Sequence, residues 1–250
     1  MLKCSSALKA MVSKIAHRFG LEITRVRPTT SNLAWLQGMD IKTIIDVGAN
    51  VGQSALHFHT LLPNAQIFSF EPLPDCYEQL CHATKDIPRI RSYNLALGDK
   101  EGEIGMHRSQ FSPSSSLLEM GDLHKEAFPF TKDQTVEMVR MTTLDTVGSH
   151  LELKRNILIK IDVQGYEDKV LAGARRTLQE TTVVILETSF YELYSGQPLF
   201  SHIHGLLSDR GFAYAGSWGQ LANPNNGIPL QQDSIFVKRG WKPPAGAAAP

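Results

Sequence analysis

A glycine-bearing segment, DVGANVGQ at residues 46–53, holds residue types suited to binding a polar ligand. It falls between a β-branched run and a helix-like segment, so its glycines lie in a predicted strand-to-helix turn. Gly48 lacks a Cβ and lets the backbone run close to a ligand, and Gly52 lets the new helix pack closely. The first turn of such a helix also offers unpaired N–H groups. This turn therefore predicts a ligand-binding site.

A carboxylate follows at the corresponding point of the next predicted strand. Glu71 comes directly after the run QIFSF at 66–70, 19 residues beyond Gly52. At that position a carboxylate can accept hydrogen bonds from the two hydroxyls of a ribose. The glycine turn and the acid together predict a site for a nucleoside-bearing cofactor.

Two such cofactors compete for this turn. Dinucleotides require G-x-G-x-x-G, because the second glycine lets the backbone touch a pyrophosphate. Asn50 stands at that second position here, so the dinucleotide pattern is broken. S-adenosylmethionine has no pyrophosphate, and Asp46 and Asn50 can supply polar groups for its amino and carboxylate ends. The pattern favours S-adenosylmethionine, and an NAD(P)-dependent oxidoreductase is the alternative.

Two further acids carry the predicted chemistry. Asp162 ends the buried-type run 156–161, and Glu187 ends the run 182–186. Transfer of a methyl group to a hydroxyl is helped by a base or a metal ion. We expect either that both carboxylates bind Mg²⁺ or that one of them acts directly as the base. Three histidines are further candidates for the base: His57, His59 and His107.

The elements that must position these residues alternate between strand and helix from residue 43 onward. Such alternation predicts an α/β fold with a mostly parallel sheet and helices on both faces. The expected strands are 43–47, 66–70, 90–97, 156–161, 182–186, 212–215 and 234–238. The expected helices are 53–62, 75–84, 166–179 and 202–210. Ligands bind at the carboxyl ends of such strands, and five acids are expected along that rim: Asp46, Glu71, Asp99, Asp162 and Glu187.

Residues 100–150 interrupt this alternation with two further predicted strands, 103–107 and 136–141. A long insertion in a compact domain is usually functional or disordered. We interpret 108–135 as a loop or lid that faces the substrate, and we expect the segment 189–198 to help form the same pocket.

Four segments resemble the FkbM-type methyltransferases over roughly residues 43 to 240. They are DVGANVGQ (46–53), FEPLP (70–74), NLALGD (94–99) and IKIDVQGYE (159–167). The resemblance implies a Rossmann-like class I methyltransferase fold, with a seven-stranded sheet, that uses S-adenosylmethionine. It also implies methylation of a hydroxyl on a small-molecule, sugar or glycolipid acceptor. A non-catalytic cofactor-binding module with the same fold is the other alternative.

The same resemblance assigns roles to individual residues. Glu71 would hold the ribose, and Asp99 would lie near the adenine. Some sugar O-methyltransferases of related fold place an aspartate pair around Mg²⁺. Thr188 follows Glu187 where such a pair would need two acids, so the sequence departs from that pattern. Four residues would line the methionine part of the cofactor: Asp46, Gly48, Asn50 and Gly52.

Composition and charge limit the remaining possibilities. Lys plus Arg and Asp plus Glu both number 25 in 250 residues, so the formal net charge is zero. A neutral chain argues against a dedicated nucleic-acid binder. Three cysteines are too few for a disulfide framework and fit a reducing, cytoplasmic setting. No apolar run approaches the roughly 18 residues that a membrane span needs.

The chain is expected to have three parts. Residues 1–40 form a helical extension, because apolar residues recur at helical spacing between lysines. This helix either covers an edge of the core or lies as a basic amphipathic helix on a membrane surface. Residues 41–239 form the methyltransferase domain, and residues 240–250, rich in Pro, Gly and Ala, are expected to be disordered.

Overall fold

The computed structural model describes residues 33–241, and the chain divides into two units between Ala34 and Trp35. The fold below belongs to the unit that begins at Trp35. The predicted amphipathic helix lies outside the described residues, and so does the predicted tail beyond Trp241. Of the predicted extension over 1–40, only the end is described, where η1 (Ala34–Met39) is a 3₁₀ helix.

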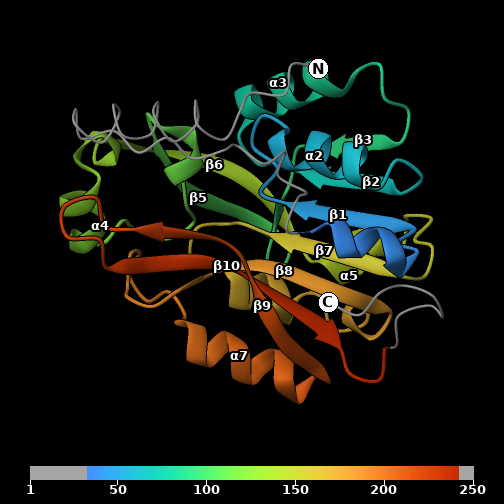
Figure 1. Cartoon of the computed structure of the whole chain (residues 1–250). Helices are drawn as coiled ribbons and strands as arrows, with labels where there is room; N and C mark the ends of the chain where they lie inside the picture. Colours follow the sequence, from blue (N-terminus) through green and yellow to red (C-terminus); the bar gives the residue numbers. More distant parts are fainter. Residues whose placement is uncertain (1–32, 242–250) are drawn as a thin grey trace, which may run out of the picture. The chain divides into compact units, whose positions relative to one another are not determined.

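A seven-stranded sheet forms the centre of this unit, with strand order β3-β2-β1-β7-β8-β10-β9 (Figure 1). The first five strands are parallel, and β10 pairs antiparallel with both β8 and β9. The predicted α/β fold with a mostly parallel seven-stranded sheet is confirmed. The strand bounds are β1 Thr43–Val47, β2 Gln66–Phe70, β3 Ile90–Tyr93, β7 Ile157–Ile161, β8 Thr181–Ser189, β9 Phe212–Ala222 and β10 Pro229–Lys238.

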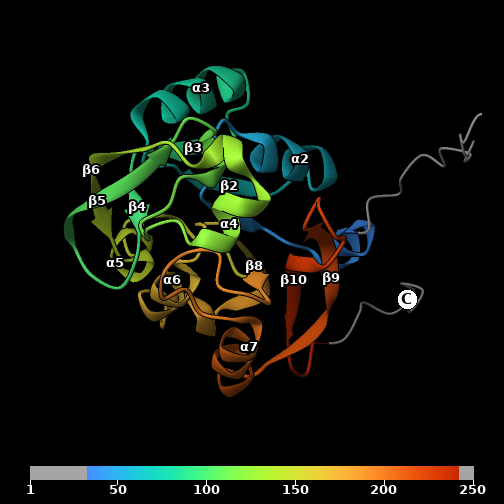
Figure 2. The same cartoon turned by 90° about the vertical axis from the view of Figure 1, so that its left-hand side faces the viewer.

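Helices cover both faces of this sheet, because its strands are apolar on both sides. On one face α2 (Gln53–Leu61) contacts β1 and β2, and α3 (Pro74–Thr84) contacts β3. On the other face lie α5 (Leu144–Gly148), α6 (Glu167–Ala172) and α7 (Phe200–Asp209) (Figure 2). Their buried residues join alternate residues of the strands in one apolar core. The glycine turn at residues 48–52 joins β1 to α2, which packs against β1 and β2.

The insertion forms a second, three-stranded sheet with order β4-β6-β5. Its strands are β4 (Ala96–Leu97), β5 (Gly102–Ser109) and β6 (Gln134–Thr142). The segment between β5 and β6 holds η2 (Ser112–Ser114), α4 (Asp122–Ala127) and η3 (Pro129–Thr131). The two strands predicted in this region are therefore confirmed, and they pair with each other antiparallel.

Two predicted elements are broken in the structure. The strand expected over 90–97 divides into β3 and β4, which lie in different sheets. Asn94 causes the division, because its side-chain amide donates to the carbonyl oxygens of Glu71 and Pro72 at 3.0 and 2.8 Å. The helix expected over 166–179 ends at Ala172 and resumes only as η4 (Thr177–Gln179). A Cβ at Gly173 would lie 1.9 Å from the carbonyl oxygen of Gly98, so the chain packs backbone to backbone there.

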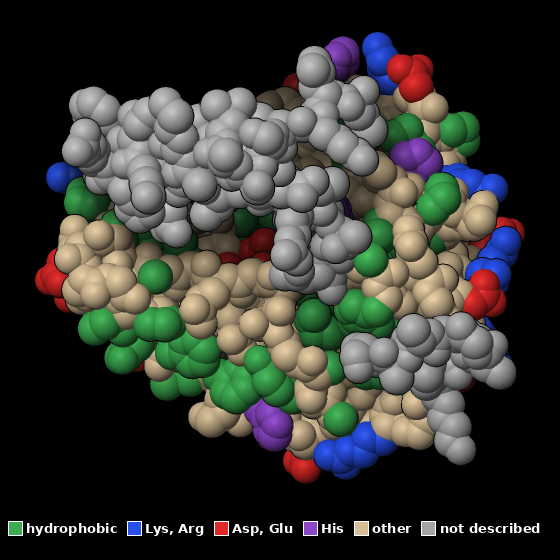
Figure 3. All heavy atoms as spheres, viewed as in Figure 1, with side chains coloured by type: hydrophobic (Ala, Val, Ile, Leu, Met, Phe, Trp, Pro, Cys, Tyr) green, Lys and Arg blue, Asp and Glu red, His purple; other side chains and the backbone are tan. Residues whose placement is uncertain are grey.

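The surface of the described residues carries charges of both signs. Acidic and basic side chains are interspersed on the face in Figure 3, where residues outside the described range cover part of the view. Among the helices of residues 33–241, none combines the length and apolar character that crossing a membrane demands.

Candidate active site

A cavity of about 530 Å³ opens at the carboxyl ends of β1, β2 and β7. The strand order reverses between β1 and β7, and ligands of open α/β sheets bind at such a switch point. The volume lies within the range of small-molecule sites. The insertion supplies a second wall, because residues of η2, α4 and η3 also line the cavity.

The glycine turn and the predicted ribose acid meet at one end of this cavity. Glu71 accepts the backbone N–H of Asn50 at 2.8 Å and that of Leu73 at 2.9 Å, and it is only 5% exposed. Burial raises the pKa of Glu71 to about 7, although both backbone hydrogen bonds act to lower it. Gly48 has φ +78, and a Cβ there would lie 1.9 Å from the backbone oxygen of Asp162. Glycine is thus required where the turn touches the end of β7.

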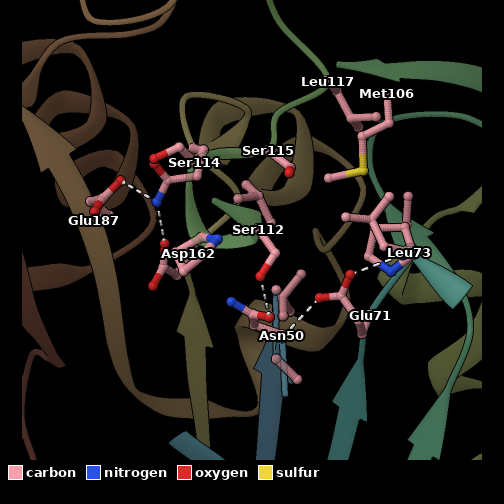
Figure 4. Close-up of a pocket in the computed structure, with 18 of the residues that line it drawn as sticks. Asn50, Glu71, Leu73, Met106, Ser112, Ser114, Ser115, Leu117, Asp162 and Glu187 are labelled. Carbon is pink, nitrogen blue, oxygen red and sulfur yellow. Dashed lines mark hydrogen bonds between the residues drawn. The ribbon is translucent and has the colours of Figure 1, made fainter. Parts of the chain in front are cut away.

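An apolar wall lies beside Glu71. Figure 4 shows Leu73 beside its carboxyl group, with Met106 and Leu117 farther up on the same side of the cavity, and Asp162 and Glu187 on the opposite side. Glu71 and this apolar wall therefore lie at one end of the cavity, and Asp162 and Glu187 line the other. This division suits a ligand with a polar sugar and a flat aromatic group at one end.

Asp162 and Glu187 line the other end, as the sequence predicted, and one amide joins them. The Nε2 atom of Gln164 donates to Asp162 Oδ1 at 2.7 Å and to Glu187 Oε2 at 3.1 Å (Figure 4). Glu187 is not at the end of its strand, however. Pairing with β10 extends β8 to Ser189, so Glu187 lies within the strand opposite Asp233. Burial raises the pKa of Glu187 well above its ordinary value, and the charges of Asp162, Glu167 and Asp233 add to the effect.

The prediction of a Mg²⁺ ion between Asp162 and Glu187 is not supported. Among the described residues no group of three or more His, Cys, Asp or Glu side chains is arranged to hold a metal. Nitrogen donors instead face the two carboxylates, because Lys160 Nζ lies 3.1 Å from Asp162 Oδ2 and Gln164 donates to both acids. Mg²⁺ requires oxygen lone pairs directed at it, and each of these carboxylate oxygens already gives one lone pair to a nitrogen donor, while the positive charge of Lys160 opposes a second cation.

Asp46 lies beneath the cavity rather than on its surface. It is fully buried and pairs across the sheet with Lys160, whose Nζ is 3.9 Å from Asp46 Oδ1. Burial raises the pKa of Asp46, and Lys160 opposes that rise. Burial alone would lower the pKa of Lys160, but Asp162 and Asp46 outweigh it and the pKa is raised. Asp46 therefore influences the cavity by helping to keep Lys160, which lines it, positively charged.

Other predicted residues lie away from the cavity. Gly52 precedes α2 and packs against Leu80, outside the lining. Asp99 follows β4 in the second sheet and is exposed, so the structure does not bring it to the cavity. Of the five acids expected along the rim, three line the cavity: Glu71, Asp162 and Glu187. The three candidate histidines also lie outside the lining: His57, His59 and His107.

The insertion contributes the wall that was predicted for 108–135. Ser112 Oγ donates to Asn50 Oδ1 at 3.2 Å, so η2 reaches across the cavity to the glycine turn. Phe111 and Phe128 both make edge-to-face contacts with Phe130, at 5.5 and 6.3 Å between ring centroids, and all three line the cavity. The segment 189–198 supplies no lining residue, but Tyr194 reaches the cavity wall through Gln164.

Sequence reasoning missed the roles of Gln231 and His124. Gln231 donates to Glu187 from β10, and His124 of α4 lines the cavity. Burial lowers the pKa of His124 to about 4, so it is neutral at pH 7. The position of Gln231 opposite β8 could have been found only from the pairing of two strands far apart in the chain.

Comparison with known proteins agrees with this geometry. The protein family described as "Methyltransferase FkbM domain" matches this chain over residues 46–214. The 2-O-methyltransferase NoeI of Sinorhizobium fredii is 32% identical over 62% of this chain and 66% of its own length, just under two thirds. The hexuronic acid methyltransferase AglP of Haloferax volcanii is 27% identical over 73% of this chain and 74% of its own.

Among solved structures, magnesium protoporphyrin IX methyltransferase of Synechocystis, with bound SAM, aligns with 95% of this chain and 86% of its own. The sequence identity is 11% and the TM-score is 0.46. A likeness at that level does not define the ligand of this chain. The family match covers more than half of the chain and includes the glycine turn, Glu71, Asp162 and Glu187. The chain therefore belongs to the FkbM methyltransferase family.

Proposed function

We propose that this chain is an S-adenosylmethionine-dependent O-methyltransferase that acts on a hydroxyl of a saccharide or another polyhydroxylated small molecule. One observation carries the proposal: a single cavity has Glu71 and the glycine turn at one end and the carboxyl groups of Asp162 and Glu187 at the other. The names of NoeI and AglP, a 2-O-methyltransferase and a hexuronic acid methyltransferase, support the acceptor class.

The residues at the first end fit the methyl donor. Each carboxylate oxygen of Glu71 accepts one backbone N–H and retains a lone pair, which a ribose hydroxyl can occupy. Leu73, Met106 and Leu117 provide an apolar wall for an adenine ring, and Asn50 provides a polar group beside it. When bound, S-adenosylmethionine supplies an activated methyl group.

The residues at the second end position the acceptor and receive its proton. Glu187 suits the role of the base, because burial raises its pKa and its carboxyl group lines the cavity. Asp162 is paired with Lys160 and suits the role of orienting the acceptor hydroxyl. We assign a saccharide ring to the wall of Phe111, Phe128 and Phe130, because aromatic faces pack well against the C–H groups of a sugar.

Calorimetry with S-adenosylhomocysteine tests the donor site, with NAD and NADP as competing ligands. We expect binding of S-adenosylhomocysteine alone. Transfer of a labelled methyl group to a panel of methyl glycosides and free hexuronic acids then tests the acceptor. Asp162→Asn and Glu187→Gln should lower turnover more than S-adenosylhomocysteine affinity. Binding without transfer to any acceptor would favour a non-catalytic module, and binding of NAD instead would favour the oxidoreductase.

A further inference from the structure

The residue between the two acids, Gln164, is held more firmly than a solvent-facing glutamine. Its backbone has φ 56, a left-handed conformation that few residues other than glycine adopt. Ser116 Oγ donates to the carbonyl oxygen of Gln164 at 2.6 Å, which ties this turn to the insertion. A strained backbone of this kind persists only when its surroundings hold it.

The amide of Gln164 has one defined orientation. The hydroxyl of Tyr194 donates to Gln164 Oε1 at 2.9 Å and is shared with the carbonyl oxygen of Ser114 at 3.2 Å. Tyr194 is 1% exposed, so its hydroxyl must find an acceptor within the protein. With Oε1 facing Tyr194, the Nε2 atom faces the acids and gives one N–H to each. All the hydrogen-bonding groups of this amide are thereby used.

We propose that Gln164 is a positioning residue of the methyl-transfer site, whose amide nitrogen keeps the carboxyl groups of Asp162 and Glu187 separated and oriented. The role of Gln164 in catalysis rests on the proposed function. Each acid has a second donor on its other oxygen, Lys160 for Asp162 and Gln231 for Glu187. Gln164 alone contacts both acids among the described hydrogen bonds, so it alone can fix their relative placement.

The charges around Asp162 and Glu187 determine whether loss of Gln164 raises or lowers the pKa of Glu187. Glu187 faces Asp162, Glu167 and Asp233, which disfavour its ionised form, and Lys160, which favours it. Asp162 lies near the same groups and near Asp46, and Tyr194 adds a neutral hydroxyl. A neutral N–H donor stabilises each carboxylate without adding charge. Loss of Gln164 should therefore raise the pH at which Glu187 ionises.

Two substitutions separate positioning from simple support of the fold. Gln164→Glu keeps the size of the side chain and can still accept the Tyr194 hydroxyl, but it removes the donors and adds a third carboxyl group. Gln164→Ala removes the side chain. The matched control is Gln66→Glu, at the end of β2 away from the cavity, where the amide of Gln66 donates to the carbonyl oxygen of Arg89 at 2.8 Å.

The main measurement is the ionisation midpoint of Glu187 by NMR of carboxyl-¹³C-labelled protein, with the signal assigned by its loss in Glu187→Gln. We expect both Gln164 variants to raise the midpoint and Gln66→Glu to leave it unchanged. We also expect kcat for methyl transfer to fall by about tenfold or more, with its acidic limb at higher pH in Gln164→Glu. The affinity for S-adenosylhomocysteine should change far less.

The result that overturns the proposal is an unchanged Glu187 midpoint in folded Gln164→Glu and Gln164→Ala protein. A loss of kcat that only follows a loss of thermal stability, with no displacement of the pH profile, would also overturn it. Failure of the wild-type protein to bind S-adenosylhomocysteine is a different result, since it refutes the proposed function. The NMR midpoint still decides whether Gln164 controls the acids in that case.

Discussion

The carboxyl group of Glu71 accepts the backbone N–H of Asn50, with 2.8 Å between Oε2 and N. The acid that follows β2 therefore holds the glycine turn that follows β1. Asn50 has φ 47, and this hydrogen bond helps to stabilise its left-handed backbone. The turn geometry and the proposed contact with a ribose would thus depend on the same carboxylate, which is buried beside the cavity.

Replacing Glu71 by alanine should weaken the binding of S-adenosylhomocysteine about tenfold to a hundredfold. A hydrogen bond to a charged group contributes roughly 1.5–3 kcal/mol, and the turn also loses its support. Titration calorimetry measures the change. Glu78→Ala, which removes an exposed acid from α3, is the control and should bind as the wild type does. Equal affinity in the two variants would refute the ribose assignment.

Gly48→Ala should destabilise the protein and abolish cofactor binding. A Cβ would meet the backbone of Asp162, which cannot move without displacing the end of β7. Gly196→Ala is a matched control, since Gly196 has φ +74 but no atom within 4 Å of an added Cβ. We expect the control to lose roughly 1–2 kcal/mol from backbone strain alone. Urea unfolding should show a clearly larger loss for Gly48→Ala; equal losses would mean that close approach is unimportant there.

Much of this fold could be predicted because it follows from local patterns. The runs 43–47 and 66–70 are rich in apolar residues and end just before turn residues, and both form strands with the predicted bounds. The parallel pairing of the five main strands and the helices on both faces follow from βαβ connections. Glu71 was correctly placed beside the glycine turn, because the ends of adjacent parallel strands meet at one edge.

The predictions that failed concern features that depend on contacts between distant segments of the chain. Asn94 ends β3 through hydrogen bonds to a loop 22 to 23 residues earlier, and this removes Asp99 from the cavity. Glu187 lies inside its strand because β10, some 44 residues later, pairs with it. No local pattern encodes such partners. The amide of Gln164 is oriented by Tyr194 in the same way, from 30 residues along the chain.

Removal of divalent metal ions should leave methyl transfer unchanged. Lys160 and Gln164 already donate to the two acids, and the ammonium group of Lys160 repels a second cation beside them. Turnover is measured after dialysis against EDTA and again after Mg²⁺ is restored. A loss of activity that Mg²⁺ reverses would show that the carboxyl groups rearrange to bind a metal.

Phe130→Ala should raise the KM for the acceptor several-fold and leave S-adenosylhomocysteine affinity unchanged. Phe130 is 64% exposed, yet it lines the cavity and contacts Phe111 and Phe128. The contribution of an aromatic contact is about 0.5–1.5 kcal/mol beyond its buried area. Val136→Ala removes an equally exposed apolar side chain outside the cavity and serves as the control. Equal KM values in the two variants would remove the aromatic wall from acceptor binding.

The stability of the protein should fall as the pH rises through the range in which Glu167 ionises. Glu167 is 2% exposed, and burial raises its pKa to about 7 from 4.5, although the N–H groups of Val163 and Gly165 donate to it. Because the folded state holds this proton more tightly, its stabilising contribution is complete below about pH 4.5 and is lost as the pH rises through about 7. Glu71, with a pKa of about 7, and Asp233, with a pKa of about 6, act in the same direction.

Glu167→Gln isolates this contribution, because glutamine has nearly the same volume and can still accept both backbone hydrogen bonds, but it cannot ionise. Its free energy of unfolding relative to the wild type should increase by roughly 3 kcal/mol between pH 4.5 and pH 8. Urea unfolding at several pH values gives this difference directly, and titrations common to both proteins cancel. Glu103→Gln, at an exposed position of β5, should show no such trend. A difference that stays constant with pH would mean that folding does not raise the pKa of Glu167, and that its backbone donors offset the effect of its burial.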